Sequence, residues 1–303
     1  MVMFLDEERI ARLLSWEKLI PAMERALAEF SQGRVLQPVR QMLTIEEEKR
    51  YLGIMPAVAE TAMGLKLVSF YPGNAGTDVP THMAMVLLFR ADTGEPLAVM
   101  DGRLITEMRT AAVSAAATQY LAAPESRVLA LLGSGVQAQA HLEALSHLHP
   151  YNEIRVWSRT PEHAARFAAA HGATATSAEV AVRGADVVVT ATNALEPILR
   201  GEWLKPGAHV NAVGSPLPNR RELDDRAMRN TLVADSREAV LKESGDVILS
   251  GAPIYAEIGE IFAGLKPAPR DQTTIFKSVG LAIEDVATAR LVYDAALVMP
   301  PRA

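Results

Sequence analysis

The amino-acid sequence predicts an α/β fold in which a doubly wound parallel sheet is joined to a second, α+β domain. Strand-like and helix-like segments alternate from residue 127 to residue 234, as in parallel sheets with crossover helices. A glycine-rich turn stands at the first strand-to-helix junction of that region, whereas the first hundred residues carry short strand-like runs between turn residues. The length of 303 residues is typical of about two domains.

The composition excludes several classes of protein. Hydrophobic residues make up 49% and charged residues 22%, which is typical of a globular chain and not of a disordered one. The net charge of −6 argues against nucleic acid as a partner, since phosphate binding needs a basic excess. The chain contains no cysteine, which excludes disulfides, thiolate nucleophiles and zinc–thiolate sites and fits a reducing compartment.

Targeting and membrane signals are not evident in the sequence. The apolar start at residues 1–5 runs directly into acidic residues without a basic n-region. The apolar runs along the whole sequence are far shorter than the roughly 18 residues that a membrane-spanning helix needs. We therefore expect a soluble, cytoplasmic protein without a membrane partner.

The first third of the chain predicts helices followed by a mostly antiparallel sheet. Apolar residues recur at helical spacing from Ile10 to Phe30, and Gly33 ends this region. Turn residues at 46–50 and 91–94 separate strand-like runs, which we expect at residues 39–45, 51–58, 64–70 and 83–89. A long Ala-rich helix over residues 104–121 then ends before Pro124.

The second region predicts the parallel sheet. Two helices are expected at residues 136–148 and 161–171. The buried-strand runs that alternate with helical segments lie at residues 127–132, 154–157, 186–190, 209–213 and 231–234. The chain then returns to an Ala-rich helix over residues 280–297.

The motif with most chemical content is Gly133-Ser134-Gly135-Val136-Gln137-Ala138. It follows an apolar strand and opens a helix, which is the context that a dinucleotide-binding turn requires. Gly133 makes the tight turn, Gly135 lets a pyrophosphate approach the backbone, and the helix N-terminus supplies amide donors. The alternative is a plain strand-to-helix turn, but the context favours a Rossmann-type, dinucleotide-binding domain.

The end of the next strand indicates which dinucleotide binds. NAD-selective enzymes usually place Asp or Glu there, to bind the ribose 2′-hydroxyl. This chain instead has Ser158-Arg159-Thr160 after Val156-Trp157, and an arginine with two hydroxyls suits a 2′-phosphate. We predict that NADPH is preferred, with NADH as the alternative; a surface arginine without a ligand is the other interpretation of Arg159.

Other catalytic patterns are not found. The sequence has no P-loop, no Gly-x-Ser-x-Gly turn and no His-Glu-x-x-His motif. His147 and His149 are two residues apart, so they do not share a helix face. We expect no metal site.

Three cations in the first domain lie in apolar surroundings. Lys66 interrupts an apolar strand, Arg40 opens one, and Arg109 interrupts a helix of small residues. Each is compatible with a long side chain whose charge reaches water. Next to a dinucleotide domain, they also predict a pocket in which arginines bind a substrate carboxylate and a buried lysine polarises or protonates the reacting group.

The sequence resembles the ornithine cyclodeaminase/mu-crystallin family over nearly its whole length, and within it the ketimine reductase branch. Gln37-Pro38-Val39-Arg40, Lys66-Leu67-Val68-Ser69-Phe70-Tyr71 and Arg109-Thr110-Ala111-Ala112 carry the resemblance in the first half, beside the glycine motif. In the second half, Lys205-Pro206-Gly207-Ala208-His209 and Leu241-Lys242-Glu243-Ser244-Gly245-Asp246 carry it.

The resemblance implies the domain organisation. Residues 119–281 would form the Rossmann NAD(P)-binding domain. Residues 1–118 and 282–303 together would form a discontinuous α+β domain that binds substrate and builds a homodimer.

The resemblance also implies the site residues. Arg40, Lys66 and Arg109 match the positions around the substrate carboxylate and the reacting nitrogen, and Glu243 is added to that pocket. Thr81 and His82 match the stretch that reaches the nicotinamide. The remaining cofactor contacts would be made by Arg109, Thr110, Gly133, Ser134, Gly135, Val136, Gln137, Ser158, Arg159, Thr160, Thr192, Val213 and Ser278.

One departure from the family pattern distinguishes between activities. Ornithine cyclodeaminases carry an aspartate directly after the Gly-Gly that ends the strand matching 212–214, and this chain has Ser215 there. The resemblance therefore implies a cytoplasmic NAD(P)H-dependent oxidoreductase that reduces cyclic ketimine carboxylates, Δ1-pyrroline-2-carboxylate or Δ1-piperideine-2-carboxylate, to L-proline or L-pipecolate. The alternatives are an ornithine cyclodeaminase, an alanine dehydrogenase or other imine reductase, and a binder of thyroid-hormone-like ligands.

Overall fold

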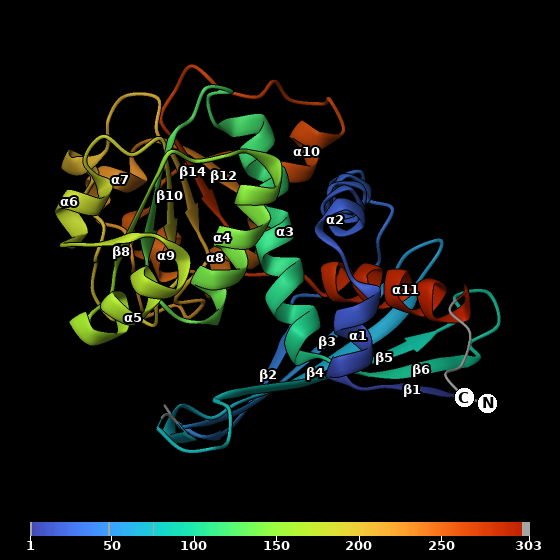
Figure 1. Cartoon of the computed structure of the whole chain (residues 1–303). Coiled ribbons are helices and arrows are strands. Elements are labelled where there is room, and N and C mark those ends of the chain that lie inside the picture. The colour runs from blue at the N-terminus through green and yellow to red at the C-terminus, as the bar shows by residue number, and fades with distance from the viewer. Residues whose placement is uncertain (1, 48, 75, 299–303) are drawn as a thin grey trace. The chain divides into compact units, whose positions relative to one another are not determined.

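The computed structural model describes residues 2–47, 49–74 and 76–298 (Figure 1). The chain divides into two compact units. Unit 1 contains residues 1–109 and 281–303, and unit 2 contains residues 110–280. Within the described residues, no helix is long and apolar enough to cross a membrane.

Unit 1 is a six-stranded mixed sheet with helices packed on it. The strand order is β1 (Met3–Leu5), β6 (Pro96–Asp101), β5 (His82–Phe89), β4 (Met63–Phe70), β3 (Arg50–Val58) and β2 (Gln41–Glu46). Only the β1–β6 pair is parallel among these described strands; the other neighbours are antiparallel. Turns between consecutive strands produce the antiparallel part, as the sequence predicts.

The helices of unit 1 come from both ends of the chain. They are α1 (Glu7–Leu13), α2 (Trp16–Ser31) and α11 (Ala282–Val298). α11 packs against β3, β4, β5 and α2. The predicted helical region from Ile10 to Phe30 is two helices, because the chain is extended at Leu14 and Ser15.

The two faces of this sheet differ. Met55, Lys66, Val86 and Met100 lie side by side in register on one face, and all four are buried. Side chains point alternately to the two faces, and Met85 on the opposite face is 50% exposed. Unit 1 therefore has a filled face and a face with exposed apolar side chains.

Unit 2 is built on an eight-stranded sheet in which all pairs are parallel. Its order is β13 (Ile254–Glu257), β12 (Thr231–Ala234), β14 (Thr274–Lys277), β11 (His209–Ala212), β10 (Val187–Thr190), β7 (Val128–Leu132), β8 (Glu153–Trp157) and β9 (Thr174–Ala175). Central strands such as β10 are buried along their whole length, which is typical of a parallel sheet covered on both faces.

The longer helices of unit 2 are α4 (Val136–Leu148) and α5 (Pro161–His171), and α3 (Arg103–Leu121) begins in unit 1 and ends in unit 2. The shorter ones are α6 (Ala178–Val182), α7 (Asp225–Met228), α8 (Arg237–Glu243), α9 (Gly245–Ser250) and α10 (Ile258–Phe262). The predicted fold class, a doubly wound parallel sheet with a discontinuous α+β part, is confirmed. The strands that were not predicted from the sequence are β1, β6, β9, β13 and β14.

Candidate active site

The order of strands in unit 2 creates a position for a ligand. From β7, the chain adds β8 and β9 on one side of the sheet and then returns to add β10 and β11 on the other side. Ligands of open α/β sheets bind at such a reversal, outside the carboxyl ends of the strands. All the loops that follow β7, β8, β10, β11 and β14 lie at that edge, because the sheet is parallel.

The glycine loop lies at the centre of this edge. Gly133 has φ +123°, and a Cβ atom there would lie 2.6 Å from the carbonyl oxygen of Ala191. Only glycine fits such a position without strain. Gly135 is the N-cap of α4, and no atom lies within 4 Å of the place where its Cβ would be.

This geometry is compatible with a dinucleotide pyrophosphate. The N-terminus of the 13-residue helix α4 is the positive end of its dipole, and it faces the loop. Gly135 has no side chain to cap the first amides of the helix, so a ligand can bind them. Ser134 and Gln137 are half-buried, and Val136 is exposed beside them.

The loop after β8 lies next to the glycine loop. The N–H of Gly133 donates to the carbonyl oxygen of Trp157 at 2.9 Å, and Ser158 follows directly. Thr160 is the N-cap of α5. Arg159 between them is exposed, so a cation and two hydroxyl-bearing residues follow β8 next to the glycine loop.

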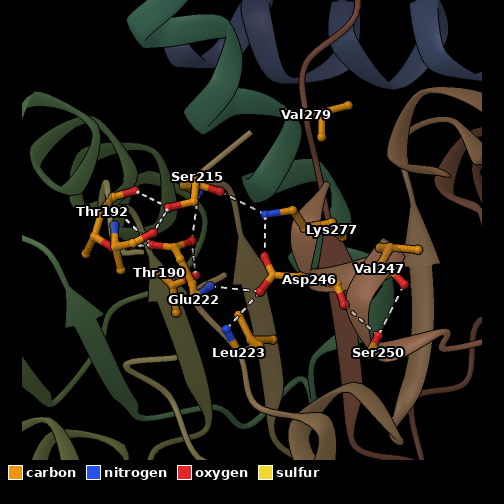
Figure 2. A network of polar contacts seen from close by, with 12 residues as sticks. Thr190, Thr192, Ser215, Glu222, Leu223, Asp246, Val247, Ser250, Lys277 and Val279 are labelled. Carbon is orange, nitrogen blue, oxygen red and sulfur yellow. Dashed lines mark hydrogen bonds and ion pairs between the residues drawn. The ribbon is translucent and has the colours of Figure 1, made fainter. Parts of the chain in front are cut away.

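Glu222 joins the loops that follow β10 and β11 (Figure 2). One carboxylate oxygen accepts from the N–H and Oγ1 of Thr192 at 2.7 and 2.6 Å. The other accepts from Oγ1 of Thr190 and from the N–H of Gly214 at 2.7 and 2.9 Å. Burial raises the pKa of Glu222, and the nearby Asp246 adds to that effect, while Lys277 opposes it.

A buried ion pair supports the same loops. Lys277 Nζ lies 2.9 Å from Asp246 Oδ2 and donates to the carbonyl oxygen of Gly214 at 2.8 Å. The other oxygen of Asp246 accepts from the backbone N–H groups of Glu222 and Leu223. The loop that contains Val213 is therefore fixed by three buried charged side chains, those of Glu222, Lys277 and Asp246.

Two further positions singled out by the sequence, Ser215 and Ser278, have structural partners. Ser215 is buried, has φ +48° and donates to the carbonyl oxygen of Ala194 at 2.8 Å. The hydroxyl of Ser278 donates to Asp235 at 3.0 Å. Burial raises the pKa of Asp235, although the N–H groups of Val279 and Gly280 also donate to it.

Unit 1 contains a buried cluster of charges. Lys66 Nζ lies 2.6 Å from Asp285 Oδ2, and Arg109 Nε donates to Asp285 Oδ1 at 3.0 Å. Arg109 Nη1 donates to Glu284 at 2.6 Å. Because Lys66 and Arg109 are both buried, the alternative that their charges reach water is wrong for these two residues.

Burial and neighbouring charges act in opposite directions in this cluster. Burial lowers the pKa of Lys66 to about 8, Asp285 partly counteracts this, and Arg109 and Arg40 lower the pKa further. Burial also opposes ionisation of Asp285, but Arg109 and Lys66 outweigh it and lower the pKa of that carboxyl. Near neutral pH the cluster holds a protonated lysine beside an ionised aspartate.

Three other predicted site residues lie in unit 1: Arg40 on the substrate side, and Thr81 and His82 on the nicotinamide side. Arg40 is half-buried and precedes β2. His82 opens β5, is exposed, and contacts Phe70 in a tilted ring pair with centroids 4.4 Å apart. The carbonyl oxygen of Thr81 accepts from the N–H of Tyr71 at 2.8 Å.

The remaining two candidates lie in unit 2. Thr110 follows Arg109 in α3, and Glu243 ends α8. The structure thus brings the cofactor candidates of the strand ends to one edge of unit 2, and Lys66 and Arg109 to one cluster in unit 1.

A model of the ornithine cyclodeaminase/mu-crystallin family matches residues 1–299. The chain belongs to this family. It is 52% identical over 301 residues to the ketimine reductase mu-crystallin of Mus musculus, with 96% of each chain covered. The family resemblance expected from the sequence is confirmed.

Solved structures of the family have the same fold. The Δ1-pyrroline-2-carboxylate reductase of Thermococcus litoralis, in complex with NADH and L-proline, matches with a TM-score of 0.92 and 37% identity, covering 98% of both chains. An archaeal alanine dehydrogenase dimer with bound NAD matches with a TM-score of 0.92 and 35% identity, covering 98% of this chain and 96% of that one.

In this member of the family, sequence reasoning missed the acidic half of the site. Glu284 and Asp285 are both buried in the first turn of α11. The signal was available, because two adjacent carboxylates stand between Ile283 and Val286 in an apolar helix, and such charges need partners. Glu222, by contrast, follows two arginines and precedes two aspartates nearby, which is typical of an exposed loop.

Proposed function

We propose that this protein is an NAD(P)H-dependent reductase of cyclic ketimine carboxylates, with Δ1-pyrroline-2-carboxylate and Δ1-piperideine-2-carboxylate as substrates and L-proline and L-pipecolate as products. The observation that carries the proposal is the buried Lys66–Asp285–Arg109 cluster. The identity of 52% to a ketimine reductase and the likeness to a reductase bound to NADH and L-proline support the same activity.

The charges suit a substrate with one carboxylate. Lys66, Arg109 and Arg40 are cationic, and Glu284 and Asp285 are anionic, so the five side chains together have one excess positive charge when all are ionised. In this proposal Arg40 and Arg109 bind the substrate carboxylate, since a guanidinium holds a carboxylate through two hydrogen bonds.

Lys66 is the proton donor in this proposal. When bound, the nicotinamide supplies the hydride that adds to the imine carbon. The proton on Lys66 Nζ passes to the imine nitrogen, so that the C=N bond becomes a C–N single bond with a new N–H. Lys66 then regains a proton from solvent. The protein otherwise contributes orientation and electrostatic stabilisation.

The cofactor would bind at the carboxyl edge of the parallel sheet. Residues 133–137 are proposed to hold the pyrophosphate through the N-terminus of α4. Ser158, Arg159 and Thr160 are proposed to bind the 2′-phosphate, which favours NADPH over NADH. The loops with Thr192, Val213 and Ser278 would lie along the nicotinamide half. In this assignment residues 119–281 form the cofactor domain.

Residues 1–118 and 282–303 are proposed as the substrate and dimerisation domain of a homodimer. Phe4, Leu43 and Met85 are 70%, 48% and 50% exposed on three strands of one sheet. An apolar face of this kind usually marks a protein interface. A cytoplasmic location fits the absence of cysteine.

A turnover assay tests the activity. Purified protein is mixed with NADPH or NADH and each cyclic imine acid, and oxidation of the cofactor is followed by absorbance. We expect consumption of NADPH with formation of L-proline or L-pipecolate. Formation of L-alanine from pyruvate and ammonia would indicate the alanine dehydrogenase activity, release of ammonia from ornithine the cyclodeaminase, and binding without turnover of any substrate a ligand carrier.

A further inference from the structure

Asp285 contacts both cations of the buried cluster through different atoms. Oδ2 lies 2.6 Å from Lys66 Nζ, and Oδ1 accepts from Arg109 Nε at 3.0 Å. Its side chain is fully buried. Because this carboxylate is shielded from bulk solvent, its charge-assisted contacts with both cations are strong and directional.

The position of Asp285 is itself fixed by the chain around it. The backbone N–H of Ile283 donates to the side-chain oxygen of Gln37 at 2.7 Å. This hydrogen bond fixes the first turn of α11 against the segment that leads to Arg40. Glu284, in the same turn, binds the other nitrogen of Arg109 at 2.6 Å. Both acids also lie at the positive end of a 17-residue helix, where negative charge is favoured.

The titratable groups that face Lys66 come from four separate parts of the chain. Asp285 lies on α11, Arg109 on α3, Arg40 before β2, and His82 on β5. Of these four groups, Asp285 alone is an acid. Glu284 forms its ion pair with Arg109, whereas Asp285 Oδ2 forms one with Lys66. Asp285 is thus the group that opposes loss of the Lys66 proton.

We propose that Asp285 is a positioning residue of the reductase: one of its oxygens keeps Lys66 protonated and aimed, and the other orients Arg109 for the substrate carboxylate. The inference rests on the proposed function. Asp285 stays ionised throughout and neither gains nor loses a proton. It links proton donation and carboxylate binding, because the same carboxylate sets both cations.

The experiment compares Asp285→Asn with the matched control Glu284→Gln, which removes the negative charge beside Arg109 and leaves the contact between Asp285 and Lys66 in place. The pKa of Lys66 is measured in the full-length protein by NMR with isotope-labelled lysine, the Lys66 signal being the one lost in Lys66→Met. We expect the pKa to fall from about 8 by roughly one to three units in Asp285→Asn, and by less than half as much in Glu284→Gln.

The pH profile of kcat/KM for reduction gives the second readout. In the wild type, the rate should fall as pH rises through about 8, because neutral Lys66 cannot donate a proton. This alkaline limb should move to lower pH in Asp285→Asn in step with the NMR value. Both variants should raise KM for the imine acid, since each removes one carboxylate from Arg109.

An unchanged Lys66 pKa in Asp285→Asn, or an equal fall in both variants, would overturn the proposal. If Asp285→Asn does not fold, Asp285→Glu keeps the charge and displaces the oxygens. Asp285→Glu should keep the alkaline limb of kcat/KM near its wild-type pH and raise KM. A shift of that limb to lower pH by roughly one to three units, as expected for Asp285→Asn, would contradict the proposed role. Failure of the wild type to reduce any cyclic imine removes the proposed function, but the NMR result still decides what Asp285 does to Lys66.

Discussion

Lys277 and Asp246 form an ion pair of 2.9 Å in which both side chains are fully buried. Replacing Lys277 by Met would leave Asp246 as an uncompensated buried charge and remove the hydrogen bond to Gly214. We expect a loss of about 3–5 kcal/mol in the free energy of unfolding, measured from urea unfolding curves recorded with a spectroscopic probe in unit 2. Lys242→Ala, at an exposed pair with Glu238, is the control and should cost less than about 1 kcal/mol.

The two glycines of the loop have different roles: Gly133 avoids backbone strain, and Gly135 leaves room for a ligand. Gly133→Ala places a Cβ against the Ala191 carbonyl at positive φ, so we expect a stability loss of roughly 1–3 kcal/mol. Gly135→Ala meets no protein atom and should leave the melting temperature nearly unchanged. It should still weaken NADPH binding at least about tenfold, because one lost charge-assisted hydrogen bond is worth about 1.5–3 kcal/mol.

Calorimetric titration with NADPH, beside thermal unfolding of the apo protein, checks both variants. Undiminished NADPH affinity in Gly135→Ala would place the pyrophosphate elsewhere.

Arg159 is exposed at the end of β8, and we expect it to select NADPH. Arg159→Ala should weaken NADPH binding roughly 10- to 100-fold, the equivalent of about 1.5–3 kcal/mol, with little effect on NADH. Arg166→Ala, at an exposed arginine within α5, should change the affinity for neither cofactor. Equal losses for both cofactors would contradict recognition of the 2′-phosphate.

Met85, half-exposed on the open sheet face of unit 1, tests the homodimer. Met85→Glu would bury an unpaired charge in a dimer interface, which should weaken the dimer by several kcal/mol. Sedimentation velocity should then find a monomer, whereas Leu265→Glu, at an exposed position of unit 2, should remain dimeric. A dimer in both variants would require another interface.

The residues that could be predicted from the sequence have a local signal. Lys66 is a charged residue in an apolar strand, and Gly133 begins a glycine motif between a strand and a helix. Both features are visible within a few neighbouring residues. β14, four residues long, lies between β11 and β12. Its place depends on pairing with strands far away in the chain, so no local pattern could predict it.

Glu222 shows the same limit within the site. Its surroundings in the sequence are charged, yet it is fully buried. Its hydrogen-bond donors are Thr190 at the end of β10 and Thr192 and Gly214 in the loops after β10 and β11. The cost of burying it is offset only once those loops are assembled. A reader of the sequence sees the charge but not the donors.

The pairing of Asp285 with Arg109 has a consequence for how the protein is synthesised. The two residues are 176 positions apart, so at about 5–20 residues per second the ribosome adds Asp285 roughly 10 to 35 s after Arg109. Until then, two cations destined for a buried site have no countercharge. Unit 2, whose residues are contiguous, is complete before α11 leaves the ribosome, and we expect the arrival of α11 to trigger the folding of the sheet in unit 1.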